Sequence, residues 1–331
     1  MTYQVIIPVL IAFAVTAILG PIIPFLRKLK IGNTEREELQ SHQKKNGTPT
    51  MGGLMILIAI VVTSLIYVKD YPRIIPILFV TVGFGIIGFL DDYLKVVLRR
   101  SDGLLAWQKM LCQIVVTAVF AVYLLHNDIS LAMLIPFSGG KYLSLSWVAV
   151  PILFLAVIGT VNGVNFTDGL DGLASSVTVL VATFFSVVAV GNACGIAPIT
   201  CAVVGALLGF LLFNVYPASV FMGDTGSLAL GGFVAATAYM MQMPVFILIV
   251  GLIYLRRQEE NASLKWLRST IILNCADGPR RGLWRCFPLL RRCCAWWHLS
   301  GCKGGRSQDT GGWKWTFQEK RFLFSEPGSA G

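Results

Sequence analysis

Charged side chains are scarce in this 331-residue sequence. Only 13% of the residues are charged, whereas about 25% is usual in a soluble domain, and 55% are hydrophobic. Histidine occurs only three times, and the eight cysteines lack the paired spacing of a zinc module. These shortages exclude an ordinary soluble enzyme and leave no sign of a structural zinc site, so the composition is typical of an integral membrane protein.

The net charge of +10 does not indicate nucleic-acid binding, because the positive charge is gathered at one end of the chain. The residues through Leu255 include 13 basic and 11 acidic side chains, and the remaining 76 residues include 14 basic and 6 acidic ones. A basic tail rather than a basic body therefore sets the pI. We expect no nucleic-acid partner.

Nine apolar runs recur through the first three quarters of the sequence, most of them near the roughly 17 to 25 residues that a membrane-spanning helix needs. The last two runs are short, and they form either a tight hairpin or one kinked helix, with Pro244 favouring a break. The prediction is an all-α, polytopic bundle of about nine transmembrane helices. The runs are 3–26, 51–68, 74–90, 110–125, 145–161, 173–190, 196–215, 228–241 and 244–255.

The loops between these runs differ in basic charge, which predicts the orientation. Ten basic residues follow the first and third runs, whereas the intervening outer loops contain three. Because cytoplasmic loops are enriched in Lys and Arg, we expect the amino terminus outside. The ten are Arg27, Lys28, Lys30, Arg36, Lys44, Lys45, Lys95, Arg99, Arg100 and Lys109; the three are Lys69, Arg73 and Lys141.

The carboxylates lie on the same side of the membrane as the basic loops. This agreement is independent evidence, because only Lys and Arg were used to assign the orientation. Five of them fall in or beside the loops assigned to the cytoplasm, among residues rich in Gly and Asn. This pattern predicts a single site that faces the cytosol. The five are Asp91, Asp92, Asp168, Asp171 and Asp224.

Asp91 and Asp92 directly follow an apolar run, and Lys95 comes next. If the helix continues, Lys95 lies one turn from both carboxylates. Adjacent carboxylates repel each other, so we expect one of them to be protonated and ready for proton transfer, or to be neutralised by a cation. A solvated helix end with an ion pair is the alternative for this motif taken alone.

Asn165, Asp168 and Asp171 recur every three residues in a stretch that also contains Gly169 and Gly172. This spacing predicts oxygen-bearing side chains along one edge of a helix or helical turn, which suits Mg²⁺ or the hydroxyls of a sugar or base. Ordinary turn chemistry is the alternative.

Asp224 lies between Gly223 and Gly226 at the expected start of a helix. Backbone amides at such a start attract anions, and Asp224 is placed to hold a metal that bridges to the anion. The alternative is a simple helix cap.

Lys44 and Lys45 precede the segment Thr48-Pro49, which we interpret as a helix cap followed by proline at the first helical position. Lysines before a helix start suit a phosphate, although they also serve as topology determinants. Taken together, the four motifs predict a site for a metal, phosphate groups and a base.

With these motifs the chain resembles the phospho-N-acetylmuramoyl-pentapeptide-transferase family, within the polyprenyl-phosphate N-acetylhexosamine-1-phosphate transferases. The resemblance covers about Met1 to Leu255 and rests on four motifs in family order. It implies a ten-helix fold with both termini outside. The motifs are Gly-Thr-Pro-Thr-Met-Gly-Gly, Gly-Phe-Leu-Asp-Asp-Tyr-Leu-Lys, Asn-Phe-Thr-Asp-Gly-Leu-Asp-Gly-Leu and Val-Phe-Met-Gly-Asp-Thr-Gly-Ser.

The resemblance also implies an activity, a cofactor and roles for residues. The family transfers phospho-N-acetylmuramoyl-pentapeptide from UDP to undecaprenyl phosphate with Mg²⁺, forming lipid I and UMP for peptidoglycan synthesis in the bacterial cytoplasmic membrane. Asp91, Asp92 and Asp224 are the implied catalytic residues, and Asp224 with Asp168 the implied metal ligands. The implied substrate-binding residues are Lys45, Lys95, Lys109, Asn165, Asp168, Asp171 and Asn214.

The residues do not decide between direct attack by the lipid phosphate and a two-step route through an aspartyl phosphate, and we favour direct attack. Membrane lipids are expected around the protein, and a homodimer is left open. Two other functions remain open: an N-acetylglucosamine-1-phosphate transferase acting on the same lipid, and a transporter in which intramembrane acids mark an ion path. The position of the acids at helix ends disfavours the transporter.

The family pattern stops near Leu255. Residues 256–331 are rich in Trp, Cys, Arg and Gly, with no spanning run and no triple histidine. We therefore divide the chain into a transferase domain, 1–255, and an aberrant basic tail, 256–331, which we interpret as disordered or as the product of a reading-frame shift. A chain with this tail is expected to be inactive or nearly so.

Overall fold

The computed structural model divides the chain into two compact units, Met1–Ala262 and Ser263–Gly331. In the first unit the structure describes residues 2–28, 48–98, 103–136 and 138–247. In the second it describes the short strands β3 (Gly304–Arg306) and β4 (Trp313–Trp315), which pair in an antiparallel register with Gly304 opposite Trp315.

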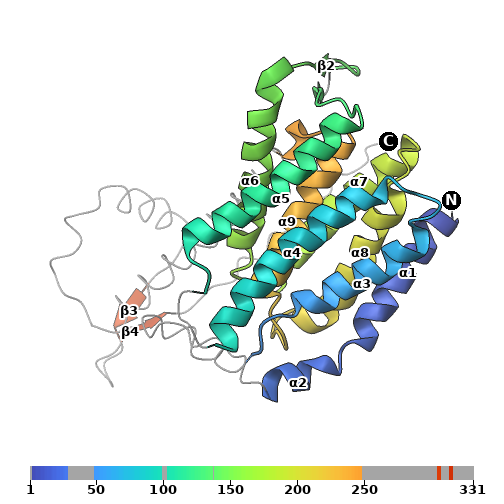
Figure 1. Ribbon diagram of the computed structural model, residues 1–331. Coiled ribbons are helices and arrows are strands. Elements are labelled where there is room, and N and C mark those ends of the chain that lie inside the picture. Colours follow the sequence, from blue (N-terminus) through green and yellow to red (C-terminus); the bar gives the residue numbers. More distant parts are fainter. Residues whose placement is uncertain are drawn as a thin grey trace, which may run out of the picture. The chain divides into compact units, whose positions relative to one another are not determined.

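The described part of the first unit is a bundle of α-helices, as Figure 1 shows. Its one strand pair is a small outer hairpin of β1 (Met133–Leu134) and β2 (Tyr142–Leu143). The 3₁₀ helix η2 (Ser146–Val148) leads into α6. The helices are α1 (Thr2–Ile18), α2 (Ile22–Lys28), α3 (Gly53–Tyr67), α4 (Ile74–Val96), α5 (Ala106–His126), α6 (Ala149–Thr167), α7 (Leu173–Gly191), α8 (Ala197–Asn214) and α9 (Gly223–Met240).

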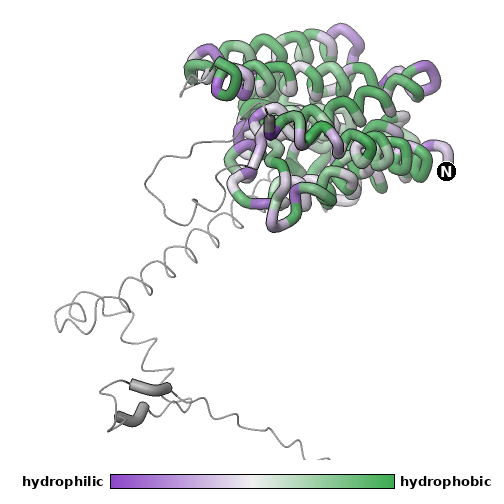
Figure 2. Tube along the Cα trace, turned by 90° about the horizontal axis from the view of Figure 1, so that it is seen from below, coloured by the Kyte–Doolittle hydropathy of each residue, from purple (hydrophilic) through white to green (hydrophobic). Residues whose placement is uncertain are grey.

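Five of the described helices are long and apolar enough to cross a membrane: α4, α5, η2 with α6, α7 and α8. The helices α1 and α3 are equally apolar but shorter. Hydrophobic residues run along the helices, and hydrophilic ones gather mainly at the helix ends (Figure 2). These features confirm the predicted class of an all-α, polytopic membrane bundle.

The helix α9 forms the centre of the bundle, where it packs against α4 and α6 (Figure 1). Every residue from 225 to 239 is buried. Small residues make this possible: a methyl group on Gly231 would overlap Val161 of α6, and one on Gly232 would press on the ring of Phe84 of α4. Because protein rather than lipid surrounds α9, the helix does not need the hydrophobicity of a lipid-facing span.

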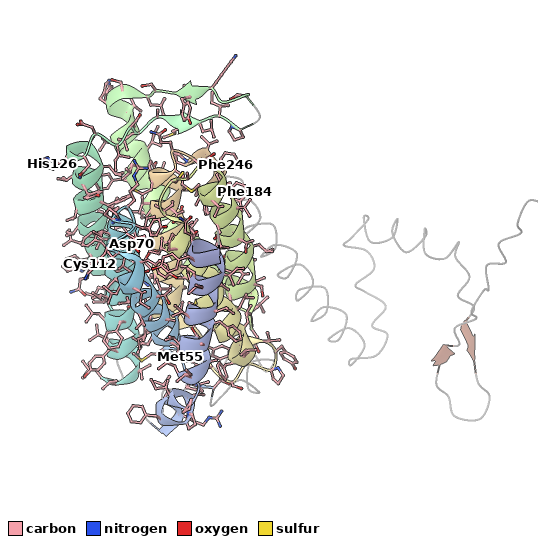
Figure 3. The ribbon with its side chains drawn as sticks, turned by 90° about the vertical axis from the view of Figure 1, so that its right-hand side faces the viewer. Met55, Asp70, Cys112, His126, Phe184 and Phe246 are labelled. Atoms are coloured by element: carbon pink, nitrogen blue, oxygen red, sulfur yellow. The ribbon has the colours of Figure 1, made fainter. Side chains whose placement is uncertain are left out.

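The two ends of the bundle are distinguished by labelled residues in Figure 3, where Met55 near the start of α3 and His126 at the end of α5 lie at opposite ends. The hairpin β1–β2 follows α5 at the His126 end and is tied to the loop after α9, because Leu134 N–H donates to the carbonyl of Gln242. Near this end Phe184 of α7 stacks on Phe246, with ring centroids 5.6 Å apart. The loop 68–73 between α3 and α4 and the loop 192–196 between α7 and α8 also lie at the His126 end, where Arg73 donates a hydrogen bond to the Cys194 carbonyl. The described loops before α3 and α5, and those that follow α6 and α8, lie at the Met55 end.

Two of the predicted elements are wrong in detail. The first apolar run is two helices rather than one, because the chain turns at Gly20–Pro21, where proline cannot continue the hydrogen-bond ladder. Thr48 and Pro49 do not start a helix: α3 begins at Gly53, and Pro49 instead accepts a hydrogen bond from Phe221 N–H, 2.8 Å away. The segment 49–53 is thus held by the loop before α9.

Three helices extend beyond the apolar runs into polar sequence. The helix α4 continues from residue 90 to Val96, α5 starts four residues before the expected residue 110, and α9 starts at Gly223 rather than at residue 228. The break predicted near Pro244 is confirmed, because α9 ends at Met240 and a new helical turn begins at residue 245. The rest of the expected ninth run, and nearly all of the expected tail, lies outside the described residues.

Candidate active site

The last turns of α4 carry the acidic pair and the first lysine of the site. Because the helix continues through Val96, Lys95 lies one turn after Asp91, and its ammonium nitrogen is 2.5 Å from Asp91 Oδ2. Asp91 Oδ1 accepts a hydrogen bond of 2.8 Å from Leu104 N–H in the loop before α5. Both oxygens of this buried carboxylate therefore have protein partners, and one is neutralised by a cation.

Asp224, in the first turn of α9, also contacts this group, although it lies 129 positions after Lys95 in the sequence. Its Oδ2 atom lies 3.1 Å from Lys95 Nζ and 2.8 Å from the Nζ of Lys109 on α5. Lys109 Nζ is also 3.8 Å from Asp91 Oδ2. Three helices thus bring two lysines and two carboxylates into one ion-pair network.

Asp92 makes a different set of contacts from Asp91. Its Oδ1 atom accepts a hydrogen bond of 3.2 Å from Asp224 N–H. Its Oδ2 atom accepts bonds of 2.9 Å and 2.6 Å from the N–H and hydroxyl of Thr225. Asp92 therefore caps the amino end of α9, a contact that no local sequence rule provides because the two residues are 132 positions apart.

Glycines allow the three chain segments around Asp224 to meet at backbone distance. A methyl group on Gly88 of α4 would overlap the Asp224 carbonyl, and one on Gly53 of α3 would overlap the Gly226 backbone. Gly223 has a φ of +72°, a conformation that L side chains rarely adopt, and a side chain there would press on Asp92. The glycine motifs thus fix where Asp224 sits.

The carboxyl end of α6 forms another wall of the site. Asn165 lies in the last turn of α6 and accepts a hydrogen bond of 3.3 Å from the Ser227 hydroxyl. Asp168 follows at the end of that helix. Asn165 and Asp168 line the same pocket as Asp92, Lys95 and Asp224.

Asp171 and Asn214 support the loops beside this pocket and are not among its lining residues. Asp171 Oδ2 accepts a hydrogen bond of 3.2 Å from Ala218 N–H. The buried Asn214 side chain accepts bonds from Gly172 N–H and the Ser175 hydroxyl and donates to the Val220 carbonyl. These contacts join the turn before α7 to the loop between α8 and α9.

The pocket has a volume of about 180 Å³ and combines charge, hydroxyl and backbone groups. Among its lining residues, Thr50, Leu170 and Phe221 fall within the sequence motifs but were not predicted individually, and Val96 lies one residue beyond the second motif and was not predicted. Lys45, the remaining predicted binding residue, lies outside the described residues. The complete lining is Thr50, Asp92, Lys95, Val96, Asn165, Asp168, Gly169, Leu170, Phe221, Gly223 and Asp224.

Asp224 is held in its ionised form. Burial by itself raises the pKa of this carboxyl, but its hydrogen bond with Asp91 and the positive charges of Lys109 and Lys95 outweigh burial and hold the pKa well below its usual range. The amino end of α9 adds a favourable dipole. The site therefore offers two ammonium groups and a permanent carboxylate next to a polar pocket.

The carboxylates of the pocket suit a magnesium ion that is held partly by the protein and partly by substrate phosphates. No ready-made cluster of three acidic, histidine or cysteine side chains occurs in the part of the chain that the structure describes. Mg²⁺ usually keeps several waters and binds one or two carboxylates together with substrate phosphates. Asp224 and Asp168 line one pocket, so they provide that number of carboxylates.

Comparison with known proteins identifies the family to which this site belongs. The glycosyl transferase family 4 matches residues 74–242, and signature 1 of phospho-N-acetylmuramoyl-pentapeptide-transferases matches residues 45–57. The phospho-N-acetylmuramoyl-pentapeptide-transferase of Acetivibrio thermocellus is 50% identical over 250 residues, which cover 74% of this chain and 76% of the relative. The chain belongs to the phospho-N-acetylmuramoyl-pentapeptide-transferase family.

Two further members of this transferase family show the same extent of similarity. The relative from Caldicellulosiruptor bescii is 45% identical over 253 residues, covering 76% of this chain and 78% of its own. The relative from Bacillus subtilis is 44% identical over 251 residues, covering 73% of this chain and 77% of its own. The predictions that the chain resembles this family and is a phosphosugar transferase are confirmed.

Proposed function

We propose that the site transfers phospho-N-acetylmuramoyl-pentapeptide from its UDP carrier to undecaprenyl phosphate, giving lipid I and UMP. The observation that carries this proposal is the convergence of Lys95, Lys109 and Asp224 beside a polar pocket in a chain of this family. The reaction joins a lipid phosphate to a pyrophosphate, so negative charge accumulates. Lys95 lines the pocket, and Lys109 is paired with Asp224, which also lines it, so two ammonium groups are placed to stabilise that charge.

The lysines are held in place for this role by the carboxylates. Asp91 and Asp224 together fix Lys95 and Lys109 from three helices, so the positions of the ammonium groups do not depend on the substrate. Groups that are already oriented stabilise a charged transition state without reorganisation. We therefore assign Lys95 and Lys109 to phosphate binding, and Asp91 to positioning them.

Direct attack is the mechanism that these contacts favour. A phosphate monoester has its second pKa near 6, so the lipid phosphate is largely a dianion at neutral pH and needs little help from a base. One of its oxygens forms a bond to the sugar-bearing phosphorus, the bond from that phosphorus to the bridging oxygen breaks, and the electron pair leaves with UMP. Asp91 and Asp92 already have partners on both oxygens, which disfavours an aspartyl phosphate.

Asp224 and Asp168 are the proposed magnesium ligands. When bound, Mg²⁺ would supply positive charge to the pyrophosphate oxygens. Asn165, with its side chain at the pocket wall, is placed to contact the sugar or the base, and Asp92 holds Asp224 in position through the α9 amino end. Asp171 and Asn214 act through the loops that they join.

The proposed location is the bacterial cytoplasmic membrane, with the site on the cytoplasmic face and the amino terminus outside. The support is the uneven loop charge, because the basic residues beside α4 and α5 lie at the same end as Asp224. This orientation places the site where a soluble nucleotide substrate is made. Membrane lipids then surround the five apolar spans.

The test is the release of UMP by detergent-solubilised enzyme. The enzyme used is the completed chain, which we define as residues 1–255 followed by the carboxy-terminal segment of the Acetivibrio thermocellus relative. With undecaprenyl phosphate as acceptor, UDP-N-acetylmuramoyl-pentapeptide should release UMP and UDP-N-acetylglucosamine should not. Release only from UDP-N-acetylglucosamine would assign the other transferase activity, and no release from either nucleotide sugar would contradict the proposed function.

A further inference from the structure

Two carboxamide side chains meet between α5 and α6, one helical turn deeper in the bundle than the active site. Asn162 Nδ2 donates a hydrogen bond of 2.9 Å to Gln113 Oε1, and Gln113 Nε2 donates one of 3.4 Å to Asn162 Oδ1. Asn162 Nδ2 also donates to the carbonyl of Ile158 on its own helix. Gln113 is only 1% exposed, so its amide depends on Asn162 for both of these hydrogen bonds.

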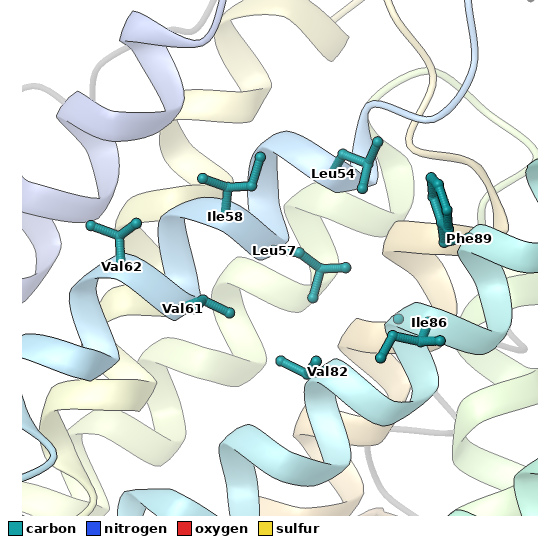
Figure 4. A pocket seen from close by; sticks show the side chains of 9 residues that line it. Leu54, Leu57, Ile58, Val61, Val62, Val82, Ile86 and Phe89 are labelled. Carbon is teal, nitrogen blue, oxygen red and sulfur yellow. The ribbon is translucent and has the colours of Figure 1, made fainter.

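Contacts between apolar helices do not require such a pair. The groove between α3 and α4, for example, is lined by apolar side chains and a glycine, as Figure 4 shows. The helix α5 is also apolar enough to cross a membrane. A carboxamide in such a helix costs free energy unless it has a partner, because lipid offers no hydrogen bond. The pair between α5 and α6 is therefore a specific connection between the two helices rather than ordinary packing.

The carboxamide pair completes a ring of polar contacts among α5, α6 and α9. One turn before the pair on α5, Lys109 Nζ lies 2.8 Å from Asp224 Oδ2 on α9. One turn after the pair on α6, Asn165 accepts a hydrogen bond of 3.3 Å from Ser227 on α9. Asp224 and Ser227 are three residues apart and share a face of α9. Each of the three helices is thus joined to the other two through polar side chains.

The helices α5 and α6 have large surfaces that face away from the bundle. Val122 of α5 is 65% exposed, and Leu155 of α6 is 76% exposed. The buried residues of α5 recur at intervals of three or four positions, so protein covers one side of this helix. With packing on one side alone, polar side-chain contacts carry more of its orientation than in a fully surrounded helix. The buried residues are Gln113, Thr117, Phe120, Ala121 and Leu124.

We propose that Gln113, through Asn162, is a positioning residue that fixes Lys109 and Asn165 at the active site. The inference rests on the proposed function, which assigns Lys109 to phosphate binding and Asn165 to the sugar or base. Tilting α5 relative to α6 would move the Lys109 ammonium group away from Asp224, and a displacement of about 1 Å at such a group can lower a rate about 100-fold. Neither carboxamide lines the pocket, so the pair acts through the two helices.

The first measurement needs no substrate and uses the full 331-residue chain in detergent. The rate at which N-hydroxysuccinimidyl acetate acetylates each lysine is followed by mass spectrometry. The Lys109 side chain is 18% exposed and paired with Asp224, so it should react slowly. Gln113→Leu approximately keeps the side-chain volume but loses both hydrogen bonds, and it should raise the Lys109 rate several-fold. The rate of Lys95, which Asp91 holds on its own helix, should change little.

Two further variants serve as control and rescue. Val115→Leu introduces the same side chain on the exposed face of α5 and should change neither lysine's rate. The exchanged pair, Gln113→Asn with Asn162→Gln, keeps the combined length of the two side chains and should restore slow acetylation of Lys109. Equal acceleration of Lys109 and Lys95 in Gln113→Leu would indicate a general loss of structure and overturn the positioning role. An unchanged Lys109 rate would overturn it too.

UMP release by the completed chain connects this role to the reaction. Gln113→Leu should lower kcat about tenfold with a smaller change in KM, because oriented charge matters most in the transition state. The exchanged pair should recover most of the rate. Faster acetylation of Lys109 with a normal kcat would overturn the assignment of Gln113 as a positioning residue for this reaction. No UMP release from the unsubstituted completed chain would instead contradict the proposed function, and acetylation would then decide alone whether Gln113 holds Lys109.

Discussion

Asp224 is the residue on which the two lysines converge, so its charge should control the site. Replacing it with Asn in the completed chain keeps the shape but removes the carboxylate from Lys95 and Lys109. We expect UMP release to fall by about two to three orders of magnitude and the Mg²⁺ dependence to weaken. The measurement is the rate of UMP release as a function of Mg²⁺ concentration. A near-normal rate at ordinary Mg²⁺ would remove Asp224 from its assigned role.

Asp92 should contribute to stability through the cap that it provides. The Asp92→Asn change replaces one acceptor oxygen with a donor amide facing the Asp224 and Thr225 N–H groups. We expect the free energy of unfolding to fall by about 1 to 3 kcal/mol. Thermal unfolding of the full chain in detergent measures this loss, and the exposed Asp70→Asn change is the control. Equal midpoints for the two variants would show that the cap is unimportant.

The sequence predicts some of these contacts and not others. The Asp91–Lys95 pair follows from helical spacing alone, because residues four apart share a face. The contacts of Lys109 with Asp224, of Asp92 with Thr225 and of Asn214 with Gly172 join separate helices. No periodicity contains that information, so the sequence indicated that these residues matter without showing that Asp92 caps α9 or that Asn214 joins two loops.

At the scale of helices, the close approach of α4 and α9 should depend on Gly88. A methyl group there would overlap the Asp224 carbonyl, so Gly88→Ala should push the two helices apart and lower the free energy of unfolding by roughly 3 kcal/mol. Gly159→Ala is the matched control, because nothing lies within 4 Å of a methyl group at that position of α6. It should be neutral or stabilising by up to about 1 kcal/mol.

Thermal midpoints and UMP release, both measured in the completed chain, test this pair of variants together. Gly88→Ala should lower both the thermal midpoint and the rate of UMP release, and Gly159→Ala should lower neither. If the two variants behaved alike, the approach of α4 to Asp224 would not matter for the site.

Helix ends were the part of the fold that apolar runs could not predict. The spans themselves followed from length and hydrophobicity, which is the strongest signal in a membrane protein. The helices α4 and α9 nevertheless continue through Asp91 to Val96 and from Gly223 to Ser227, where hydropathy is low. Partners on other helices satisfy these polar residues, and the charged turns that hydropathy leaves out are the ones that form the site.

For the molecule as a whole, loop charge predicts that the β1–β2 hairpin faces outward and the loop after α4 inward. Alkaline phosphatase, which is active only outside the cytoplasm, can report this. Fused after Gly139, in the exposed hairpin, it should be active, and fused after Leu98 it should be inactive. The reverse pattern would place the site on the outer face and contradict the proposed orientation.

The division of the chain at residue 255 remains a proposal, since almost all of the tail lies outside the described residues. We propose that residues 256–331 do not belong to the catalytic fold. The support is that the family match ends at residue 242 and that the similar relatives cover about three quarters of the chain. On this view, α4, α5 and α9 form the ion-pair network, and the tail contributes no residue to the catalytic fold.

The most direct measurement is lipid I formation from UDP-N-acetylmuramoyl-pentapeptide and undecaprenyl phosphate, at equal membrane abundance, by two proteins: the completed chain and the chain as it stands. The account predicts lipid I from the completed chain and little or none from the chain as it stands. Comparable activity from both would show that the tail is a working part of the enzyme. Failure of the completed chain would contradict the central claim, that the network of Asp91, Lys95, Lys109 and Asp224 is a phosphosugar transferase site.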